Sequence, residues 1–381
     1  MESKIQCAAY YFPNFHPDPR NENVHGKNWT EWEVVKCARP RFAGHRQPKI
    51  PAWGYEDESR PEVMAKKIDT AADHGIDAFV FDWYWYDGPF LSRALEEGFL
   101  HAENRNRLKF ALMWANHDWR NIHPARRGVP SPVNFYWTTS AESVGFVWDY
   151  IVEHYFIQPN YWRINGKPYF SIYAMNRFIR QMGGVAAAGR AVALLRKKAK
   201  QAGLPGVHIS GIWFDVLDTD PRVSECSQEA WVTEIGLDSY TSYNNVCTTD
   251  LWMNVFPRID YREAAEGYYA ICRKALKTLP GPYYPVVTVA WDSSPRTIPS
   301  DVYEAGLGYP FLPVMETDPA AFREVIRKTK ALLTDRPPEE RILFFNAWNE
   351  WTEGSYLEPD QWHGDALLKI LQDEFRQGKD F

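Results

Sequence analysis

The stretch RILFFNAWNEWTEGSYLEPD, residues 341–360, joins a run of apolar residues to a polar loop that carries two carboxyl groups. Arg341–Trp348 has the length and the apolar content of a buried β-strand. Glu350 and Glu353 follow in the loop where the apolar run ends. In parallel barrels the functional side chains lie just beyond the carboxyl ends of the strands, so this stretch predicts both a strand and a site at its end.

Seven further apolar runs upstream show the same change to polar or aromatic residues at their ends. We expect strands at Ile5–Phe12, Asp77–Trp83, Lys109–Trp114, Pro168–Tyr173, Val207–Trp213, Ile235–Tyr240 and Tyr284–Trp291. Helical periodicity after the eight runs predicts helices near Pro61–His74, Pro89–Asn104, Ala141–Tyr155, a stretch ending at Gly203, Ser224–Trp231, Tyr261–Leu279, Pro319–Leu333 and Asp365–Phe375. The chain therefore contains eight β–α units.

Eight such units in 381 residues, with no Gly/Ser-rich linker between them, predict a single (β/α)8 TIM barrel with long βα loops over residues 1–381. The alternative is a doubly wound open sheet. Such sheets often carry G-x-G-x-x-G or G-x-x-x-x-G-K-[ST] after a strand to bind phosphate, and neither motif occurs here. The sequence therefore favours the barrel.

Composition and charge exclude several classes of partner. With 43 basic and 49 acidic side chains the net charge is −6, which disfavours nucleic acid as a partner. No apolar run is long enough to insert into a membrane. The start, MESKIQCAAYYF, lacks the pattern of a signal peptide, which fits a cytoplasmic protein or the mature form of a periplasmic or secreted one. The oligomeric state is left open.

Aromatic residues are abundant, with 17 Trp, 21 Tyr and 21 Phe, and many stand beside polar residues at strand ends. Flat apolar rings and nearby polar groups together suit a carbohydrate, although core packing accounts for many of the rings. We expect a carbohydrate substrate bound by Tyr10, Tyr11, Asp82, Trp83, Trp85, Trp114, Asn116, His117, Asp118, Tyr173, Trp213, Tyr240, Trp291, Asp292, Asn346, Trp348, Asn349 and Trp351. Tyr10 and Tyr11 alternate in direction, so at most one of them faces the cleft.

Glu350 and Glu353 are the predicted catalytic pair. Glycoside hydrolysis commonly uses two carboxyl groups, one protonated and one ionised, whose surroundings separate their pKa values. The alternative interpretation is structural, with one glutamate capping a turn or pairing with an arginine. Asp215 and Asp292 are the rivals for the role of catalytic acid.

Metal and cofactor chemistry is not indicated. The ten histidines are not paired at ligand spacing, the five cysteines include no C-x-x-C, and no H-E-x-x-H, EF-hand loop or G-x-S-x-G occurs. We therefore expect no metal and no obligatory cofactor.

Several motifs in order along the chain resemble the WbsX-type, glycoside hydrolase family 99-like proteins. They are YYFPNF at Tyr10–Phe15, NWTEW at Asn28–Trp32, HRQP at His45–Pro48, FDWYWYDG at Phe81–Gly88, WANHDW at Trp114–Trp119 and FNAWNEWTEGSYLEPD at Phe345–Asp360. The resemblance implies a retaining, endo-acting α-mannosidase or α-mannanase on a (β/α)8 barrel that works through a 1,2-anhydro sugar. It makes Glu350 the base toward the sugar 2-hydroxyl and Glu353 the acid, then base, at the glycosidic oxygen. Thr352 stands where that family's motif has a histidine.

Three functions follow as hypotheses. The first is a glycoside hydrolase that cleaves an α-linked poly- or oligosaccharide with retention. The second is a non-catalytic glycan-binding barrel, and the third is a glycosyltransferase of polysaccharide biosynthesis, a label that WbsX-type proteins have carried. Sugar and linkage specificity are beyond what residue spacing indicates.

Overall fold

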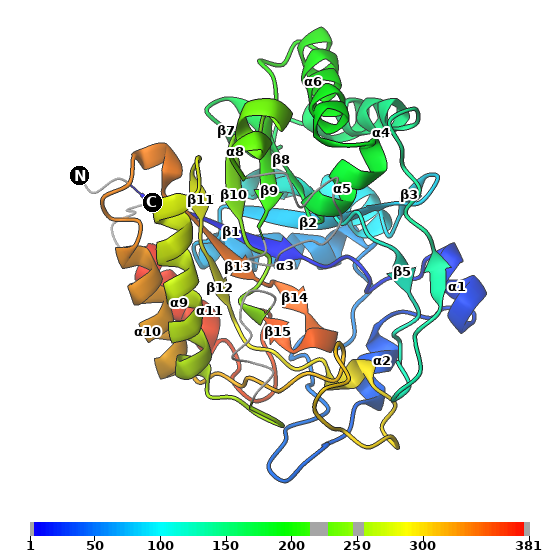
Figure 1. The fold of residues 1–381 in the computed structure, drawn as a ribbon. Helices are drawn as coiled ribbons and strands as arrows, with labels where there is room; N and C mark the ends of the chain where they lie inside the picture. The colour runs from blue at the N-terminus through cyan, green and yellow to red at the C-terminus, as the bar shows by residue number, and fades with distance from the viewer. Residues whose placement is uncertain (1–3, 214–227, 247–254, 377–381) are drawn as a thin grey trace.

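A parallel barrel forms the centre of the computed structural model, which describes residues 4–213, 228–246 and 255–376 (Figure 1). Its neighbouring strands run in the order β11-β10-β9-β8-β4-β2-β1-β13-β12. The strand bounds are β1 Gln6–Tyr11, β2 Ala78–Trp85, β4 Lys109–Trp114, β8 Lys167–Ile172, β9 His208–Ile212, β10 Ser239–Thr241, β11 Tyr283–Tyr284, β12 Val286–Thr288 and β13 Ile342–Asn346. This arrangement confirms the predicted TIM barrel.

Proline 285 divides the predicted seventh strand into β11 and β12. Proline has no backbone N–H and cannot donate to a neighbouring strand. Its carbonyl still accepts a bond from the Phe344 N–H at 2.9 Å. Because β11 pairs with β10 and β12 pairs with β13, the two ends of the strand order are halves of one strand, and the barrel closes.

The helices lie outside the ring, as the periodicity predicts (Figure 1). Those that match predicted helices closely are α3 Pro61–Asp73, α4 Val144–Ile151, α6 Val185–Gln201, α9 Tyr261–Thr278, α10 Pro319–Ala331 and α11 Ala366–Phe375. Asp260 and Asp318 begin α9 and α10 because their side chains accept backbone N–H groups of the first turn. Helices α9, α10 and α11 lie side by side on one flank.

Two predicted segments differ from the structure. The predicted helix Pro89–Asn104 begins instead as strand β3, Pro89–Phe90, which pairs back onto β2, and continues as a π-helical turn and two short 3₁₀ turns. The predicted strand Ile235–Tyr240 begins only at Ser239, because Gly236, at a φ of 85°, ends a π-helical turn there. The predicted helix Ser224–Trp231 begins outside the described residues, and only α8, Gln228–Ala230, and the turn after it are described.

Short elements in the loops shape the end of the barrel at which the strands finish. They are α1 Pro19–His25, α2 Trp32–Cys37, β5 Trp119–Arg120, β6 Val133–Phe135, α5 Met175–Met182, β14 Asn349–Glu350 and β15 Ser355–Tyr356. The short strand β7, Arg163–Ile164, lies at the other end, where it pairs with the start of β8. Across the described residues, no helix has both the length and the apolar character needed to span a bilayer.

Close packing of α6 against the turn at Trp231–Ile235 generates a stability prediction. A Cβ added at Gly189 of α6 would lie 2.3 Å from the Glu234 carbonyl oxygen. Gly189→Ala should therefore lower the free energy of unfolding by about 1–3 kcal/mol, because this overpacking must move backbone. Gly145→Ala in α4 is the matched control, since its nearest neighbour would be 3.9 Å away. Denaturant unfolding should show Gly145→Ala at or slightly above wild-type stability, and equal effects of the two changes would contradict the packing argument.

Candidate active site

A cavity of about 700 Å³ opens at the carboxyl ends of the barrel strands. Side chains from the first, second, third, fourth, sixth, seventh and eighth βα loops contribute to it. Its lining among the described residues includes Phe12, Asp82, Tyr84, His117, Asp118, Arg120, His123, Tyr173, Arg177, Tyr243, Trp291, Arg296, Tyr309, Glu350 and Glu353. This is the barrel face on which TIM-barrel active sites lie.

Glu350 and Glu353 lie in the cavity wall after β13, with 3% and 7% of their surface exposed. Glu350 ends β14, and Glu353 closes a single 3₁₀ turn. Gly354 then reverses the chain at a φ of 64°, and a Cβ there would lie 2.6 Å from Lys49 Nζ and 2.7 Å from Asp292 Cβ. Only glycine fits this position, where the chain reverses directly after Glu353.

Arg296 occupies the centre of the carboxyl cluster and is itself buried. Its Nη1 donates to Glu353 Oε1 at 2.9 Å, and its Nη2 lies 3.4 Å from Glu350 Oε2 and 3.0 Å from Glu31 Oε1. Its Nε also donates to the Thr352 hydroxyl at 2.8 Å. One guanidinium thus contacts three buried carboxyl groups.

Glu31, in the first loop, is the carboxyl of this cluster that stays ionised. Burial alone would raise its pKa, but the charges of Arg296 and His123 and its hydrogen bonds hold the pKa well below its ordinary value. Asn14 Nδ2 donates to its Oε2 at 2.6 Å, and the Thr352 hydroxyl donates to its Oε1. The Glu31 carboxylate therefore neutralises part of the positive charge of Arg296.

Glu350, Glu353 and Asp82 are the remaining carboxyl groups near Arg296, and Glu31 leaves them only part of its positive charge. Burial and the nearby Glu353 raise the pKa of Glu350 well above its ordinary value, against the opposing effect of Arg296. Burial also raises the pKa of Glu353, against Arg296 and a hydrogen bond from Tyr309 at 2.8 Å. Burial likewise raises the pKa of Asp82. Burial therefore favours the protonated forms of these carboxyl groups.

Both neighbours of Glu350 are anchored by a second buried ion cluster behind the wall. Asn349 Nδ2 donates to Glu58 Oε1 at 2.9 Å, and Trp351 Nε1 donates to Glu358 Oε2 at 2.7 Å. Lys67 of α3 forms ion pairs with both of these glutamates, with Nζ 2.6 Å from Glu358 Oε1. The residues before and after Glu350 are therefore fixed to the barrel.

Seven of the predicted site residues meet in the cavity lining. They are Asp82, His117, Asp118, Tyr173, Trp291, Glu350 and Glu353. At the outer end Asp118 accepts the Trp137 N–H at 2.9 Å and pairs with Arg177. His117 is half-buried, and its partial removal from water lowers its pKa.

The other predicted contacts lie outside that lining, where they pack or anchor loops. They are Tyr10, Tyr11, Trp83, Trp85, Trp114, Asn116, Trp213, Tyr240, Asp292, Asn346, Trp348, Asn349 and Trp351. Tyr10 faces the barrel interior and donates to the Ser242 carbonyl at 3.0 Å, while Tyr11 faces α3 and contacts Met64 Sδ. Asn116 bridges to the Ala174 backbone in both directions. As substrate contacts they stay predictions.

Of the two aspartates that rival the glutamate pair as catalytic acid, only Asp292 lies among the described residues. Asp292 is wholly buried and bonded to His45 Nε2 at 2.8 Å and Gln47 Nε2 at 2.6 Å, and it lies outside the cavity lining. Burial would raise its pKa, but the bond from His45 and the charge of Lys49 hold it below the ordinary value. Asp215 lies outside the described residues.

Sequence reasoning missed Arg296 and Tyr309 as candidate site residues. They come from the long loop after β12, where no strand end signals a site. Tyr243 stands three residues after Tyr240, and its place at the end of the sixth strand indicates a rim position from the sequence alone. Glu31 lies within the NWTEW motif, which carried the resemblance but suggested no role.

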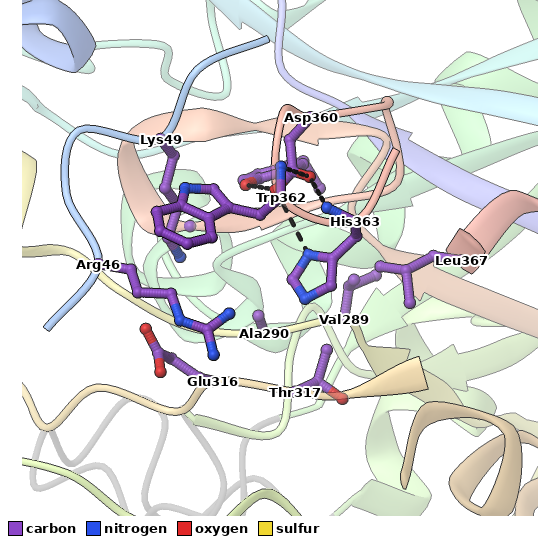
Figure 2. A pocket seen from close by; sticks show the side chains of 12 residues that line it. Arg46, Lys49, Val289, Ala290, Glu316, Thr317, Asp360, Trp362, His363 and Leu367 are labelled. Carbon is purple, nitrogen blue, oxygen red and sulfur yellow. Dashed lines mark hydrogen bonds and ion pairs between the residues drawn. The ribbon is translucent and has the colours of Figure 1, made fainter. Parts of the chain in front are cut away.

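A second, smaller pocket of about 40 Å³ lies on the other side of the loop that carries Glu353 (Figure 2). Asp360 there accepts the backbone N–H groups of Trp362 and His363 at 2.9 and 2.5 Å. Arg46 stacks on the exposed Trp362 ring at 5.2 Å, with Glu316 nearby. The pocket is too small for a sugar ring. Within the described part of the chain, no group of three His, Cys, Asp or Glu residues could hold a metal ion.

Comparison with known proteins places the chain in a family. The family model described as Glycosyltransferase WbsX matches residues 7–371. The protein WxcX of Xanthomonas campestris pv. campestris strain B100 is 29% identical over 379 residues, covering 98% of this chain and 50% of that protein. The chain thus spans about half the length of the curated relatives it matches.

Solved structures share the fold at low identity. A glycoside hydrolase-like protein aligns with a TM-score of 0.59 at 14% identity, covering 98% of this chain and 94% of its own. The family 99 endo-α-mannosidase of Bacteroides thetaiotaomicron, in complex with Bis-Tris-propane, aligns with a TM-score of 0.57 at 15% identity, covering 98% and 97%. The chain therefore shares the TIM-barrel fold of these proteins. The chain belongs to the WbsX family, as the motifs predicted.

Because Arg296 contacts three buried carboxyl groups, Arg296→Met should lower the free energy of unfolding by an amount that depends on pH. Glu31 has a lowered pKa in the folded protein, so its ionised form stabilises the fold above the unfolded-state pKa of about 4.3 and that contribution is lost as the pH falls. Without Arg296 the free energy of unfolding should drop by about 3–5 kcal/mol at neutral pH, because buried charges lose their partner.

Urea unfolding across the acid range measures this effect. The difference between wild type and Arg296→Met should shrink as the pH falls, because protonation removes the unpaired negative charges from the variant, whereas Glu31 in the wild type stays ionised until the pH reaches its lowered pKa. Arg296→Lys is the matched control and should lose less stability, because it keeps a charge at this position. A difference that is the same at neutral and acid pH would contradict the electrostatic account.

Proposed function

We propose that the protein is a retaining glycoside hydrolase that cleaves an α-linked poly- or oligosaccharide with Glu350 and Glu353. The observation that carries this proposal is the pair of buried carboxyls, both with raised pKa values, on one wall of a cavity at the carboxyl ends of the strands. Carboxyl groups that share protons near neutral pH supply the acid and the base that glycosidic bond cleavage needs.

Glu353 suits the role of acid. Its Oε1 accepts from Arg296 and Tyr309, while its Oε2 is buried with no hydrogen-bond partner among the described residues. Burial raises the pKa of this cavity-lining carboxyl, which favours the protonated form that an acid needs. The proton passes to the glycosidic oxygen as the bond to the leaving sugar breaks.

Glu350 suits the role of base. The Tyr243 hydroxyl lies 2.8 Å from its Oε1, and Arg296 Nη2 lies 3.4 Å from its Oε2, so its ionised form has partners on both oxygens. In the anhydro-sugar route of the resembling family, this carboxylate takes the proton of the sugar 2-hydroxyl. The oxygen so activated attacks the anomeric carbon as the bond to the leaving sugar breaks. Water later attacks the same carbon and gives a proton to Glu353, while Glu350 returns its proton to the 2-oxygen as the anhydro ring opens.

Substitution of either glutamate tests the assignment. Glu350→Gln and Glu353→Gln should each reduce glycan cleavage on the order of 10²–10⁴-fold, the usual contribution of a general acid or base. Glycan affinity should stay within about tenfold, because the amide keeps the shape of the side chain. Glu316→Gln is the matched control, since Glu316 lines the second pocket, and it should cleave as wild type does. Cleavage that survives both substitutions would overturn the proposal.

Leaving-group dependence separates the two roles. Glu353→Gln should remain active on aryl glycosides whose leaving group needs no protonation, whereas Glu350→Gln should lose activity on both kinds of substrate. Paired assays with an activated aryl glycoside and a natural oligosaccharide measure the ratio. Equal damage to both substrates in Glu353→Gln would mean that Glu353 is not the acid.

Glycosyl transfer is the second candidate, because the matching family model is described as a glycosyltransferase. It requires a sugar nucleotide as donor, so calorimetric titration with a panel of sugar nucleotides tests it. Saturable binding at the barrel cavity would favour transfer over hydrolysis.

A further inference from the structure

The hydroxyl group of Tyr243 lies between two buried carboxyls of the cavity. Its Oη is 2.8 Å from Asp82 Oδ2 and 2.8 Å from Glu350 Oε1. A phenol carries one proton and donates one hydrogen bond. Burial raises the pKa of Tyr243 well above its ordinary value, so the phenol is neutral. Two ionised carboxylates would then leave one short oxygen–oxygen contact without a proton, and one of the two carboxyls must donate to Oη.

The surroundings of the two carboxyls decide which one carries that proton. Arg296 Nη2 lies 3.4 Å from Glu350 Oε2, which favours a charge on Glu350. In the described ranges of the chain, no lysine, arginine or histidine forms an ion pair with Asp82, which is 3% exposed. The Asp82 Oδ1 atom is buried and has no hydrogen-bond partner among the described residues. With a neutral carboxyl at Asp82 and a carboxylate at Glu350, both contacts of Tyr243 Oη are hydrogen bonds and the charge of Glu350 faces Arg296.

We propose that Asp82 is a positioning residue that holds a proton at rest and, through the Tyr243 hydroxyl, keeps Glu350 ionised. The hydrogen bonds then run from Asp82 to Tyr243 Oη and from Tyr243 Oη to Glu350 Oε1. This inference rests on the proposed role of Glu350 as base, and it explains how a carboxyl in so acidic a cavity stays ready to accept a proton. Among the described residues, the other titratable or charged groups around the pair are Arg296, Glu353, Glu31, Tyr84, Tyr309 and Tyr10.

The pH profile of kcat/KM distinguishes this role from a merely structural one. Asp82→Asn keeps a neutral side chain whose amide can still donate to Oη. Its acid limb, which reports ionisation of the base, should therefore stay at the wild-type position, because a neutral amide replaces a neutral carboxyl. Tyr243→Phe removes the donor to Glu350, and its acid limb should move to higher pH.

Asp118→Asn is the matched control, because Asp118 lines the same cavity but pairs with Arg177 and does not contact Tyr243. Its acid limb should stay at the wild-type position. Structural damage lowers kcat/KM without moving the acid limb. A shift of the acid limb to lower pH in Asp82→Asn would show that the substitution removed an ionised Asp82, and an unmoved limb in Tyr243→Phe would show that its hydroxyl does not donate to Glu350. Either result would overturn the proposal.

A measurement without substrate tests the proton directly and remains valid if the hydrolase assignment fails. The infrared difference spectrum between wild type and Asp82→Asn at neutral pH should contain the C=O stretch of a protonated carboxyl. Asp118→Asn should give carboxylate bands instead, because its ion pair with Arg177 lowers the pKa. Carboxylate bands in the Asp82 difference spectrum would show that Asp82 is ionised and would overturn the proposal.

Discussion

The Arg296 guanidinium is the interaction on which the site depends. It lies within about one hydrogen-bond length of Glu31, Glu350 and Glu353. Glu31 comes from the first loop and the other two glutamates from the eighth, far apart in the sequence. Burying three carboxyls without a cation is strongly unfavourable, so the fold of the first, seventh and eighth loops around the cavity is coupled to this one side chain.

The cavity contains more carboxyl groups than its single cation, Arg296, can balance, and this excess decides which of them are ionised. Glu31 is stabilised as a carboxylate by several donors, and the charge of Arg296 that remains cannot ionise Glu350, Glu353 and Asp82 together. Some of these groups therefore hold protons near neutral pH, as an acid and a base working together require. The barrel supplies the burial, and the loops supply the donors that give each carboxyl a different environment.

The sequence predicts the barrel well because each strand is a short apolar run followed by helical periodicity, and the closing run Arg341–Trp348 is unambiguous. It also predicts Glu350 and Glu353 as cavity residues, since they follow a strand directly. The sequence does not predict Arg296 and Tyr309 as site residues. A long loop brings them to the cavity, and only tertiary contacts show where such a loop folds. Trp348, Trp351 and Asn349 illustrate the converse, since polar and aromatic residues at a strand end also anchor the loop to the barrel.

Hydrolysis of a glycosidic bond in water enriched in heavy oxygen tests the central claim most directly. Wild-type protein is incubated with a panel of α-linked poly- and oligosaccharides, and the products are sized and weighed by mass spectrometry. The account predicts shortened chains with one heavy oxygen at each new reducing end, and none with Glu353→Gln. Intact glycans throughout the panel, together with chain extension when a sugar nucleotide is added, would contradict it.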